Sequence, residues 1–465
     1  MKDKLLKYVE EINEPFQQAA QDIWENPELG MQEFYAADRL VKLLEDNGFS
    51  VEKGAAGLPT AFVAEYGEGR PVIGFSAEFD ALPGLSQRND VTVKEPVVPM
   101  GPGHGCGHNL LSTGGMQAAV ALKKLMEEKH LKGTLKVFGT PAEEICIGKP
   151  FMARAGLFEG LDAVVDWHPG AANFTHSSRN NAYFNVKYYF TGKAAHGNAP
   201  WRGVSALDSA MLMGHSLEII REHIEPGAEG SESTLNYAFP DCGNAYPVVV
   251  PDRAAIWVVG RFETAEICSS VIAKVRKAAE GCALATGTTV EEEFITATHE
   301  MIPNRVISEK MNENFRYIGP PPADEEDQET IKAIQRELGY DDTGFSGVIE
   351  EVREAHIPVT DSSEYSWNAP LGIAQAAIVP QLEMAGHNWM MTRMAGSSAG
   401  MKARATAAKL LAITAYDLLT DEKLLADARE EWQQRMGGRT YQTLIPEGVE
   451  PDPDTNKDIM EKFRR

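Results

Sequence analysis

The feature that most constrains the fold is a series of short, nearly continuous apolar runs separated by helical periodicity in roughly the first 180 residues. Three of the runs that we expect to be strands read VIGFSAEFD, TLKVFGT and DAVVDWH. Between the first two, a helix is predicted from about Leu111 to Lys129. Strands that are apolar on both faces and alternate with helices are typical of a mainly parallel sheet covered on both sides. This part of the chain is therefore predicted to be α/β.

The pattern changes at about Ala182. The predicted order then becomes strand, helix, strand, strand, helix and strand, which is the order of a ferredoxin-like α+β unit. After it we expect two helices, the short strand AQAAIVP, and a long amphipathic helix, SAGMKARATAAKLLAITAYDLL, which packs back on the first sheet. We therefore predict a main domain built from residues 1–182 and 298–465, with residues 183–297 inserted as a second domain. The acidic tail from Glu447 is expected to be a surface strap or partly disordered.

Charge and cysteine content limit the partners and the compartment. The net charge of −24 over 465 residues argues against nucleic acid or an anionic membrane surface as a partner, because both would be repelled. A negatively charged substrate would need a local positive site. No apolar run reaches the length of a spanning helix, and the five cysteines are odd in number and widely spaced, which suits a reducing compartment. We predict a cytoplasmic protein.

Polar groups gather where the apolar strands end. Glu143 and Glu144 follow one strand, His168 ends the next, and the loop GHGCGHN carries Cys106 and His108 nearby in the chain. The carboxyl ends of parallel strands meet at one rim of a sheet, where the chemistry of such folds is found. Thiolate, imidazole and carboxylate groups together can bind divalent metal ions. The sequence therefore predicts a metal site at this rim.

The residue types leave several chemistries open. In a metal-dependent hydrolase, one of the adjacent glutamates can bind metal while the other holds the attacking water. Cys106 could instead be a nucleophile with a histidine base, because the C-x-H spacing keeps the two groups near each other. Two adjacent glutamates could also be no more than a solvated acidic turn.

A set of motifs along the chain narrows this choice. GFSAEFDALPG, GHGCGHNLL, GTPAEE, DWHPG, KAAHGNAPWRGVSALDSA and MAGHNWMM follow the order found in the M20 metallopeptidase and aminoacylase family. The chain most resembles the amidohydrolase branch of that family, which has a cysteine metal ligand, and the resemblance runs from about Trp24 into the tail. It implies a phosphorylase/hydrolase-like α/β catalytic domain with an inserted ferredoxin-like lid, the dimerisation domain. The element order above agrees with this.

The resemblance also implies the roles of individual residues. It gives two divalent metal ions per chain, Zn²⁺ or Mn²⁺ with Co²⁺ as a further candidate, and Glu143 as the general base and acid. Ser76-Ala77-Glu78 stands where most of the wider family has His-x-Asp, so Cys106 and His108 are expected to compensate, and Glu78 and Asp80 to be supporting residues. The five implied metal ligands are Cys106, His108, Glu144, His168 and His387.

Two lid residues complete the implied site. His196 matches a histidine that reaches from the lid of one protomer into the site of the other and stabilises the oxyanion. Arg261 matches an arginine that pairs with a substrate carboxylate, and would be the local positive site. We expect a homodimer joined through the lid, where STLNYAF or AYFNVKYYF would expose a sheet edge.

The predicted function is hydrolysis of an amide bond in N-acyl or N-aroyl amino acids of the aminobenzoyl-glutamate type, or in small dipeptides. The partner is then a small molecule with a carboxylate, and not nucleic acid or a membrane. Two alternatives remain open: hydrolysis of another C–N bond, such as that of an aromatic amine, and a non-catalytic role as partner of a related second subunit.

Overall fold

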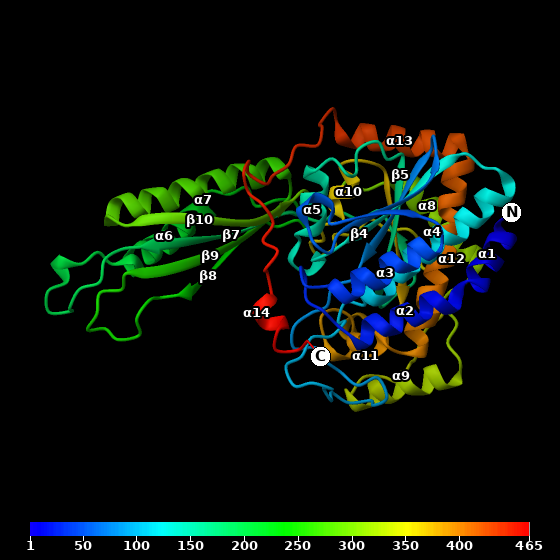
Figure 1. Ribbon diagram of the computed structural model, residues 1–465, viewed down its shortest axis with the longest axis horizontal. Helices are drawn as coiled ribbons and strands as arrows, with labels where there is room; N and C mark the ends of the chain where they lie inside the picture. The colour runs from blue at the N-terminus through cyan, green and yellow to red at the C-terminus, as the bar shows by residue number, and fades with distance from the viewer. Residues whose placement is uncertain (465) are drawn as a thin grey trace.

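The computed structural model describes residues 1–464 and contains two separate sheets. In Figure 1 the smaller sheet and its helices project to the left from the rounded body that holds the larger one. In spatial order the seven strands of the large sheet are β1 (Ser50–Lys53), β2 (Phe62–Glu68), β4 (Gly133–Thr140), β3 (Val72–Glu78), β5 (Ala163–Gly170), β11 (Leu371–Ala377) and β6 (Phe174–His176).

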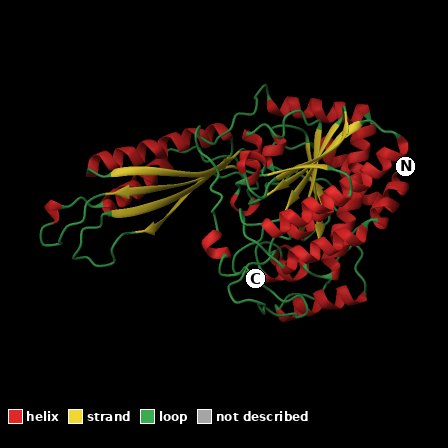
Figure 2. Ribbon diagram, viewed as in Figure 1, coloured by secondary structure: helices red, strands yellow, loops and turns green. Residues whose placement is uncertain are grey.

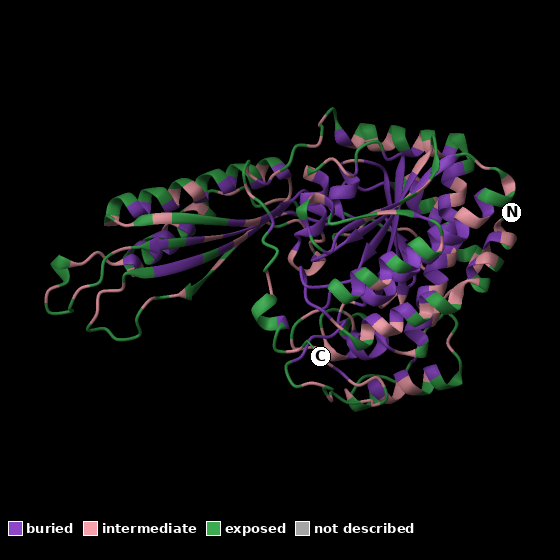
Figure 3. Cartoon of the chain, in the orientation of Figure 1, coloured by how far each residue is buried: buried purple, intermediate pink, exposed green. Residues whose placement is uncertain are grey.

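The centre of the large sheet is parallel and buried. Strands β4, β3, β5 and β11 run in the same direction, whereas β1, β2 and β6 are antiparallel to their neighbours. The central strands are purple along most of their length in Figure 3, which agrees with their apolar sequences. The predicted parallel α/β sheet is confirmed, and the carboxyl ends of β3, β4 and β5 share one rim.

Helices cover both faces of this sheet. On one face α4 (His108–Lys129), α8 (Arg305–Ile318) and α12 (Ser398–Thr420) pack on the strands, and α1 (Lys2–Glu11) and α2 (Asn13–Glu25) pack on those helices. The remaining helices of the body are α3 (Phe34–Asp46), α5 (Gly148–Arg154), α9 (Glu325–Glu337), α10 (Ser363–Ser366), α11 (Trp389–Ala395), α13 (Glu422–Met436) and α14 (Lys457–Met460), with the 3-10 turns η1 (Ala55–Gly57), η2 (Glu143–Ile145) and η4 (Leu382–Met384).

Two helices differ from their predictions. Helix α4 begins at His108, not near Leu111, because its first turn is buried and polar and so lacks the apolar periodicity that marks a helix start. Helix α12 does pack on the large sheet, but it is not amphipathic: the consecutive residues 410–413 are all buried. Other elements surround it on every side, so no polar face is required.

The small sheet has the predicted ferredoxin-like order. Its elements are β7 (Ala182–Thr191), η3 (Pro200–Arg202), α6 (Ala206–Glu222), β8 (Thr234–Asp241), β9 (Arg253–Phe262), α7 (Ala265–Thr286) and β10 (Thr289–Thr298). Helices α6 and α7 pack on each other and on the sheet, and Figure 2 shows the strands as one layer beside them. We call this unit, with the loops between its elements, the lid.

One predicted edge of the lid is wrong. The strand order is β10-β7-β9-β8, so the segment AYFNVKYYF of β7 pairs on both sides and is internal. The segment STLNYAF, which contributes β8, does form an edge, and β10 forms the other. In a ferredoxin-like sheet the first strand lies between the third and the fourth, and this connectivity excludes β7 from the edge.

The C-terminal tail packs against the body as a strap. Met460 of α14 is buried, and its sulfur accepts a hydrogen bond from the main-chain N–H of Leu29 at 3.4 Å. In Figure 1 the red tail descends along the side of the body that faces the lid. Among the described helices, none combines the length and the apolar composition that crossing a membrane requires.

Candidate metal centre

Three groups of potential metal ligands lie at the rim of the large sheet, each with its ligand atoms within 4.8 Å of one another. Cys106 belongs to two of the groups and His108 to two, so the three groups form one continuous cluster. All five ligands implied by the sequence, and Glu143, are in it. The groups are Cys106, His108 and His168; Cys106, Glu144 and His387; and Glu78, His108 and Glu143.

The glycines around Cys106 allow two segments of the chain to approach closely. Gly107 has φ +80° and precedes α4, and a Cβ atom there would lie 2.7 Å from Pro169 Cγ. Pro169 follows His168 directly, so this contact brings the cysteine loop against the end of β5. As a result Cys106 Sγ lies 3.2 Å from His168 Nε2.

Hydrogen bonds orient both buried histidines toward the cluster. His108 Nδ1 lies 2.8 Å from Asp80 Oδ1, and His168 Nδ1 lies 2.7 Å from the carbonyl oxygen of Pro169. An imidazole that donates from Nδ1 keeps its lone pair on Nε2. In each ring, Nε2 is the nitrogen that faces the cluster.

Glu143 and Glu144 lie on a strained turn after β4. The residues on either side, Ala142 and Cys146, have φ of 56° and 54°, a left-handed conformation that residues with a Cβ rarely adopt. The turn is held by Glu33, which accepts from Ala142 N at 2.8 Å, and by Asp80, which accepts from Glu144 N at 2.9 Å. Strain of this kind is found at functional sites, where the surrounding structure enforces it.

Burial and crowded carboxylates shift the pKa values of the acidic groups. Burial, with the nearby Glu78 carboxylate, raises the pKa of Glu143 to about 7. Burial raises the pKa of Glu144 well above its ordinary value, although His108 opposes the shift. Burial likewise raises the pKa of the Cys106 thiol, with a contribution from Glu144. A bound cation would stabilise the charged forms of all these groups.

The histidines respond differently to the same surroundings. Burial and the neighbouring His108 lower the pKa of His168 to about 4, which favours the neutral form that binds metal. Burial also lowers the pKa of His387. Burial disfavours the charged form of His108 too, but Cys106 and Asp80 outweigh it and raise the pKa of His108.

The donor set fits divalent cations. His108 Nε2 and Glu144 Oε1 are buried and have no hydrogen-bond partner among residues 1–464, although both face the cluster. Buried polar atoms are normally paired, so unpaired atoms that converge on one place are suited to coordinating an ion. One thiol, three imidazoles and a carboxylate provide ligands of mixed softness, as divalent metal sites do.

His387 joins the cluster from a different part of the chain. It precedes α11, is 54% exposed, and places Nε2 3.2 Å from Glu144 Oε2. It follows no predicted strand, so the argument from strand ends could not find it. Only the resemblance to the family pointed to this residue.

A buried charge network behind the cluster was not predicted. Lys149 is fully buried, with Nζ 2.6 Å from Glu78 Oε1 and in contact with Asp361. Ser362 Oγ donates between Glu78 Oε1 at 3.2 Å and Asp166 Oδ2 at 3.1 Å. Lysine is normally exposed, so the sequence carries no signal for Lys149 in this role. Its ammonium group offsets the negative charge gathered beneath the metal-binding rim.

The structure does not bring His196 or Arg261 into the cluster of their own chain. His196 is exposed on the lid, and its Nδ1 accepts from Asn198 N at 3.0 Å. Arg261 lies near the end of β9, with its guanidinium carbon 5.5 Å from the ring centre of Tyr183. Neither residue belongs to any of the three ligand groups.

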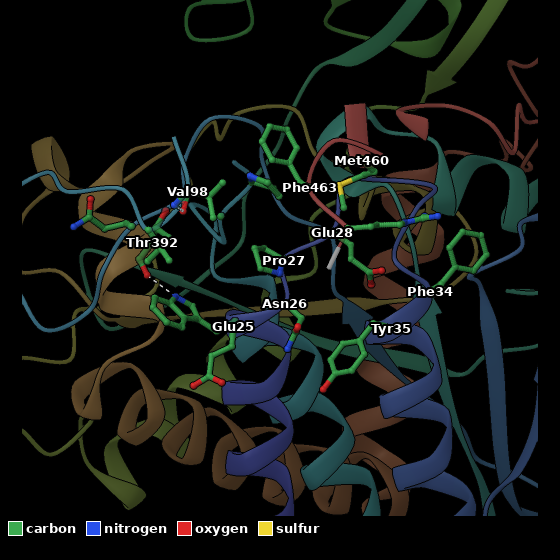
Figure 4. Close-up of a pocket in the computed structure, with 17 residues that line it drawn as sticks. Glu25, Asn26, Pro27, Glu28, Phe34, Tyr35, Val98, Thr392, Met460 and Phe463 are labelled. Atoms are coloured by element: carbon green, nitrogen blue, oxygen red, sulfur yellow. Dashed lines mark hydrogen bonds between the residues drawn. The ribbon is translucent and has the colours of Figure 1, made fainter. Parts of the chain in front are cut away.

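A cavity of about 620 Å³ lies apart from the cluster. Figure 4 shows it between the end of α2, the start of α3 and the C-terminal tail. Its wall is mainly aromatic and aliphatic, and none of the potential metal ligands lines it. Labelled residues that line it include Phe34, Tyr35, Val98, Met460 and Phe463.

An α/β sheet whose strand ends carry thiol, imidazole and carboxylate groups, beside a projecting lid, defines a metal-dependent hydrolase. The chain belongs to peptidase family M20/M25/M40, which it matches over residues 74–388, and is a metal-dependent amidohydrolase or peptidase.

Relatives of known name extend over nearly the whole chain. It is 33% identical to one of the two named subunits of p-aminobenzoyl-glutamate hydrolase from Escherichia coli (strain K12), covering 96% of this chain and 97% of that protein. It is 29% identical to Xaa-Arg dipeptidase of Mus musculus, with 94% and 93% covered. The aminobenzoyl-glutamate utilization protein from Klebsiella pneumoniae has a similar fold, with a TM-score of 0.63 at 17% identity over 90% of this chain and 99% of that chain.

Proposed function

We propose that this enzyme cleaves the amide bond of N-acyl or N-aroyl amino acids, including compounds of the aminobenzoyl-glutamate type, or of small dipeptides. The observation that carries the proposal is the continuous ligand cluster, in which Cys106 is shared by two groups. The names of the two relatives, an aminobenzoyl-glutamate hydrolase and a dipeptidase, support this choice of substrates.

We propose that two divalent ions bind to this cluster. The thiol and the imidazoles favour Zn²⁺, and the carboxylates also suit Mn²⁺ or Co²⁺. When bound, such ions polarise the amide carbonyl and lower the pKa of water. Asp80 holds His108 in position for this role, and Lys149 neutralises Glu78 beside it. The ligands in this proposal are Cys106, His108, Glu144, His168 and His387.

Glu143 moves the proton in the proposed reaction. Its carboxylate takes a proton from the water whose oxygen attacks the amide carbonyl carbon, and then gives that proton to the nitrogen as the C–N bond breaks. A pKa of about 7 suits a group that must both accept and release a proton near neutral pH. Products are a carboxylic acid and an amine.

His196 and Arg261 act on the substrate in this proposal. His196 comes from the lid of the opposite protomer and stabilises the oxyanion, which fits its exposed position away from the cluster of its own chain. Arg261 pairs with the carboxylate of the substrate.

The proposed homodimer forms through the lid. The edge strand β8 offers unpaired backbone groups, and α6 exposes three apolar side chains, Met211, Leu212 and Ile219, which are 59%, 39% and 53% exposed. A related second protein is the alternative partner, since the Escherichia coli hydrolase named above has two different subunits.

Two further assignments belong to this proposal. The two separate sheets support a division into a catalytic domain of residues 1–182 and 298–465 and a lid of residues 183–297. Five cysteines without a disulfide among the described residues support a reducing, cytoplasmic location.

The test begins with the metal content of the protein as purified. Up to two ions per chain are expected. The purified enzyme is then assayed for amine release from a panel comprising p-aminobenzoyl-glutamate, N-benzoyl and N-acetyl amino acids, dipeptides ending in arginine, and an aromatic amine. No bound metal, or cleavage of only the aromatic amine, would contradict the proposal.

A second candidate mechanism rests on one distance. Cys106 Sγ lies 3.2 Å from His168 Nε2, close enough for a thiol nucleophile and its base. A cysteine hydrolase of this kind would keep its activity after complete chelation of metal, whereas the metal-dependent enzyme would lose activity and regain it on adding metal back.

A further inference from the structure

The hydroxyl of Thr360 holds one oxygen of the Glu143 carboxylate. Thr360 Oγ1 lies 2.7 Å from Glu143 Oε1, and the main-chain N–H of Ser362 donates to the same Oγ1 at 3.2 Å. Because a carboxylate only accepts, the hydroxyl proton must point to Glu143 while the hydroxyl oxygen accepts from Ser362. The other oxygen, Oε2, faces the metal-binding cluster, 3.8 Å from His108 Nε2.

The main chain of Thr360 is held in turn by a buried asparagine. Asn180 Nδ2 donates to the carbonyl oxygen of Thr360 at 3.0 Å. Asn180 Oδ1 accepts from the main-chain N–H of Met301 at 2.8 Å. The second bond uses the carbonyl end of the amide, which leaves the NH₂ end for Thr360. Both ends of the Asn180 side chain are therefore fixed.

These two contacts lie on the two chain crossings between the body and the lid. Asn180 is just before β7, which begins at Ala182, and Met301 is just after β10, which ends at Thr298. The lid is joined covalently to the body only at these two places. A rotation of the lid acts on them first, because hinge residues absorb the change in backbone angle.

The chain after Thr360 is anchored to the body. Asp361 accepts from the main-chain N–H of Lys149 at 3.2 Å and also contacts its ammonium group. Ser362 Oγ bonds to Glu78 and Asp166 as described above. Thr360 thus lies between a fixed, buried charge network and the hinge of the lid.

We propose that Thr360 is a positioning residue for Glu143, and that Asn180 couples the position of the lid to the orientation of this base. The inference rests on the proposed role of Glu143 in proton transfer. With the Asn180–Thr360 bond made, Glu143 presents Oε2 to the reacting groups. A movement of the lid that breaks this bond releases Thr360 and leaves Glu143 free to rotate.

The first test separates positioning from structure. Thr360→Val keeps the shape and removes the hydroxyl, and kcat on p-aminobenzoyl-glutamate, or on the panel compound cleaved fastest, is expected to fall on the order of 10-fold or more, because the bond to a charged group is lost. KM and metal content should stay near wild type, and Thr360→Ser should recover most of kcat.

Thr175→Val is the matched control. Thr175 is also fully buried, and its hydroxyl donates to the main-chain oxygen of Ser308 at 2.7 Å, away from the cluster. It should leave kcat near wild type. A wild-type kcat in Thr360→Val, or a loss of kcat that is accompanied by loss of metal, would overturn the proposal.

The second test addresses the coupling to the hinge. Asn180→Ala should lower kcat with metal content unchanged, and should raise hydrogen exchange at the Met301 and Ser362 amides. Its neighbour Asn181 is equally buried and donates to the lid at Glu232 O, 3.2 Å away, without touching Thr360. Asn181→Ala should therefore keep kcat. An equal loss of kcat in both variants would show that a loosened hinge, and not the bond to Thr360, is responsible.

Failure of the inference and failure of the proposed function give different results. If Glu143→Gln keeps full activity, the role of Glu143 is wrong and the Thr360 variants lose their premise. If Glu143→Gln is inactive with metal retained while Thr360→Val is fully active, only the positioning role is wrong.

Discussion

Glu143 and Glu144 are adjacent in sequence but have different surroundings. The side chain of Glu143 accepts from Thr360 and faces His108, whereas the side chain of Glu144 faces His387 at 3.2 Å and its main-chain N–H is bound by Asp80. The turn between Ala142 and Cys146 directs the two carboxylates to different parts of the cluster. This geometry supports one role for each: proton transfer for Glu143 and metal binding for Glu144.

A pair of isosteric variants tests this division. Glu143→Gln should leave metal content near wild type and lower kcat by roughly 100-fold or more, because the amide cannot accept a proton. Glu144→Gln should instead lower the metal content, since a neutral amide is a weaker ligand. Metal analysis and steady-state kinetics on both variants check the prediction. Equal loss of metal in the two would show that both residues are ligands.

His387 provides a separate test of the ligand set. It is the most exposed residue of the cluster and belongs to only one group, with Cys106 and Glu144. His387→Ala should therefore lose at least one ion while the fold is kept, because no core packing is removed. Metal content and the unfolding transition are the measurements. Full metal occupancy in this variant would remove His387 from the ligand set.

Residues on strand ends could be predicted from the sequence, whereas residues brought in by tertiary packing could not. Cys106, Glu144 and His168 lie in or next to loops that follow apolar strands, so the topology alone places them at one rim. Lys149 and Thr360 reach the same place through α5 and a long loop, and neither residue type signals burial. Their positions depend on contacts with Glu78, Asp361 and Glu143 that no local pattern encodes.

At the scale of elements, the packing of α4 on β3 decides where His108 lies. A Cβ atom on Gly115 of α4 would be 2.5 Å from the main-chain oxygen of Ser76 on β3, so the helix cannot approach closely with any other residue. Gly115→Ala should lower the free energy of unfolding by roughly 1–3 kcal/mol, the usual effect of overpacking. It should also weaken metal binding, because α4 begins at His108.

Gly281 of α7 is the matched control for this prediction. No heavy atom outside the local helix lies within 4 Å of a Cβ placed there, and Gly281 is exposed. Gly281→Ala should stabilise by about 0.5–1 kcal/mol, because alanine is the better helix former. Denaturant unfolding and metal titration of both variants are the measurements. A stabilising effect of Gly115→Ala would contradict the proposed helix–strand contact.

The segment that leads out of the lid carries a buried ion pair with a predictable pH dependence. His299 Nδ1 lies 2.9 Å from Glu364 Oε1. Burial alone would lower the pKa of His299, but Glu364 outweighs it and the pKa lies above its ordinary value. A pKa that is higher in the folded state contributes stability that is complete below the unfolded value, about 6.5, and is lost as pH rises through the folded value.

The difference in free energy of unfolding between wild type and His299→Gln should therefore be largest near about pH 6 and shrink toward about pH 9. With Glu364→Gln as the background, which keeps the hydrogen-bond acceptor but removes the charge, the difference should change little with pH. Denaturant unfolding across this range is the measurement. A difference that grows as pH rises would show that the pair is not charged in the folded protein.

Element order was predictable where periodicity is strong, and boundaries were not. The alternation of strands and helices, and the ferredoxin-like order after Ala182, are visible in the sequence because each strand buries apolar side chains with a regular period. The place of β7 inside its sheet depends on pairing with β9 and β10, which are distant in the chain. Sequence periodicity describes the faces of a strand and does not identify its neighbours.

At the scale of the whole molecule, the lid extends away from the body and leaves His196 far from any ligand of its own chain's cluster in the arrangement described. Its exposed apolar residues lie on α6, beside the edge strand β8, where a second lid can pack and extend the sheet. A two-fold arrangement of this kind would be isologous, so each protomer would supply the same residue to its partner. The cluster would then be complete only in the dimer.

Mixing two inactive variants tests this without a structure of the dimer. His196→Ala lacks the oxyanion donor and Glu143→Gln lacks the base, so each homodimer should be inactive. In a heterodimer the chain that carries His196→Ala keeps Glu143 and receives His196 from its partner, so one of the two sites is complete. If protomers exchange at random, half of the dimers are mixed, and about a quarter of wild-type activity should return. Exchange can be followed with differently tagged chains. A mixture that stays inactive after exchange is demonstrated would mean that His196 acts within its own chain or takes no part in the reaction.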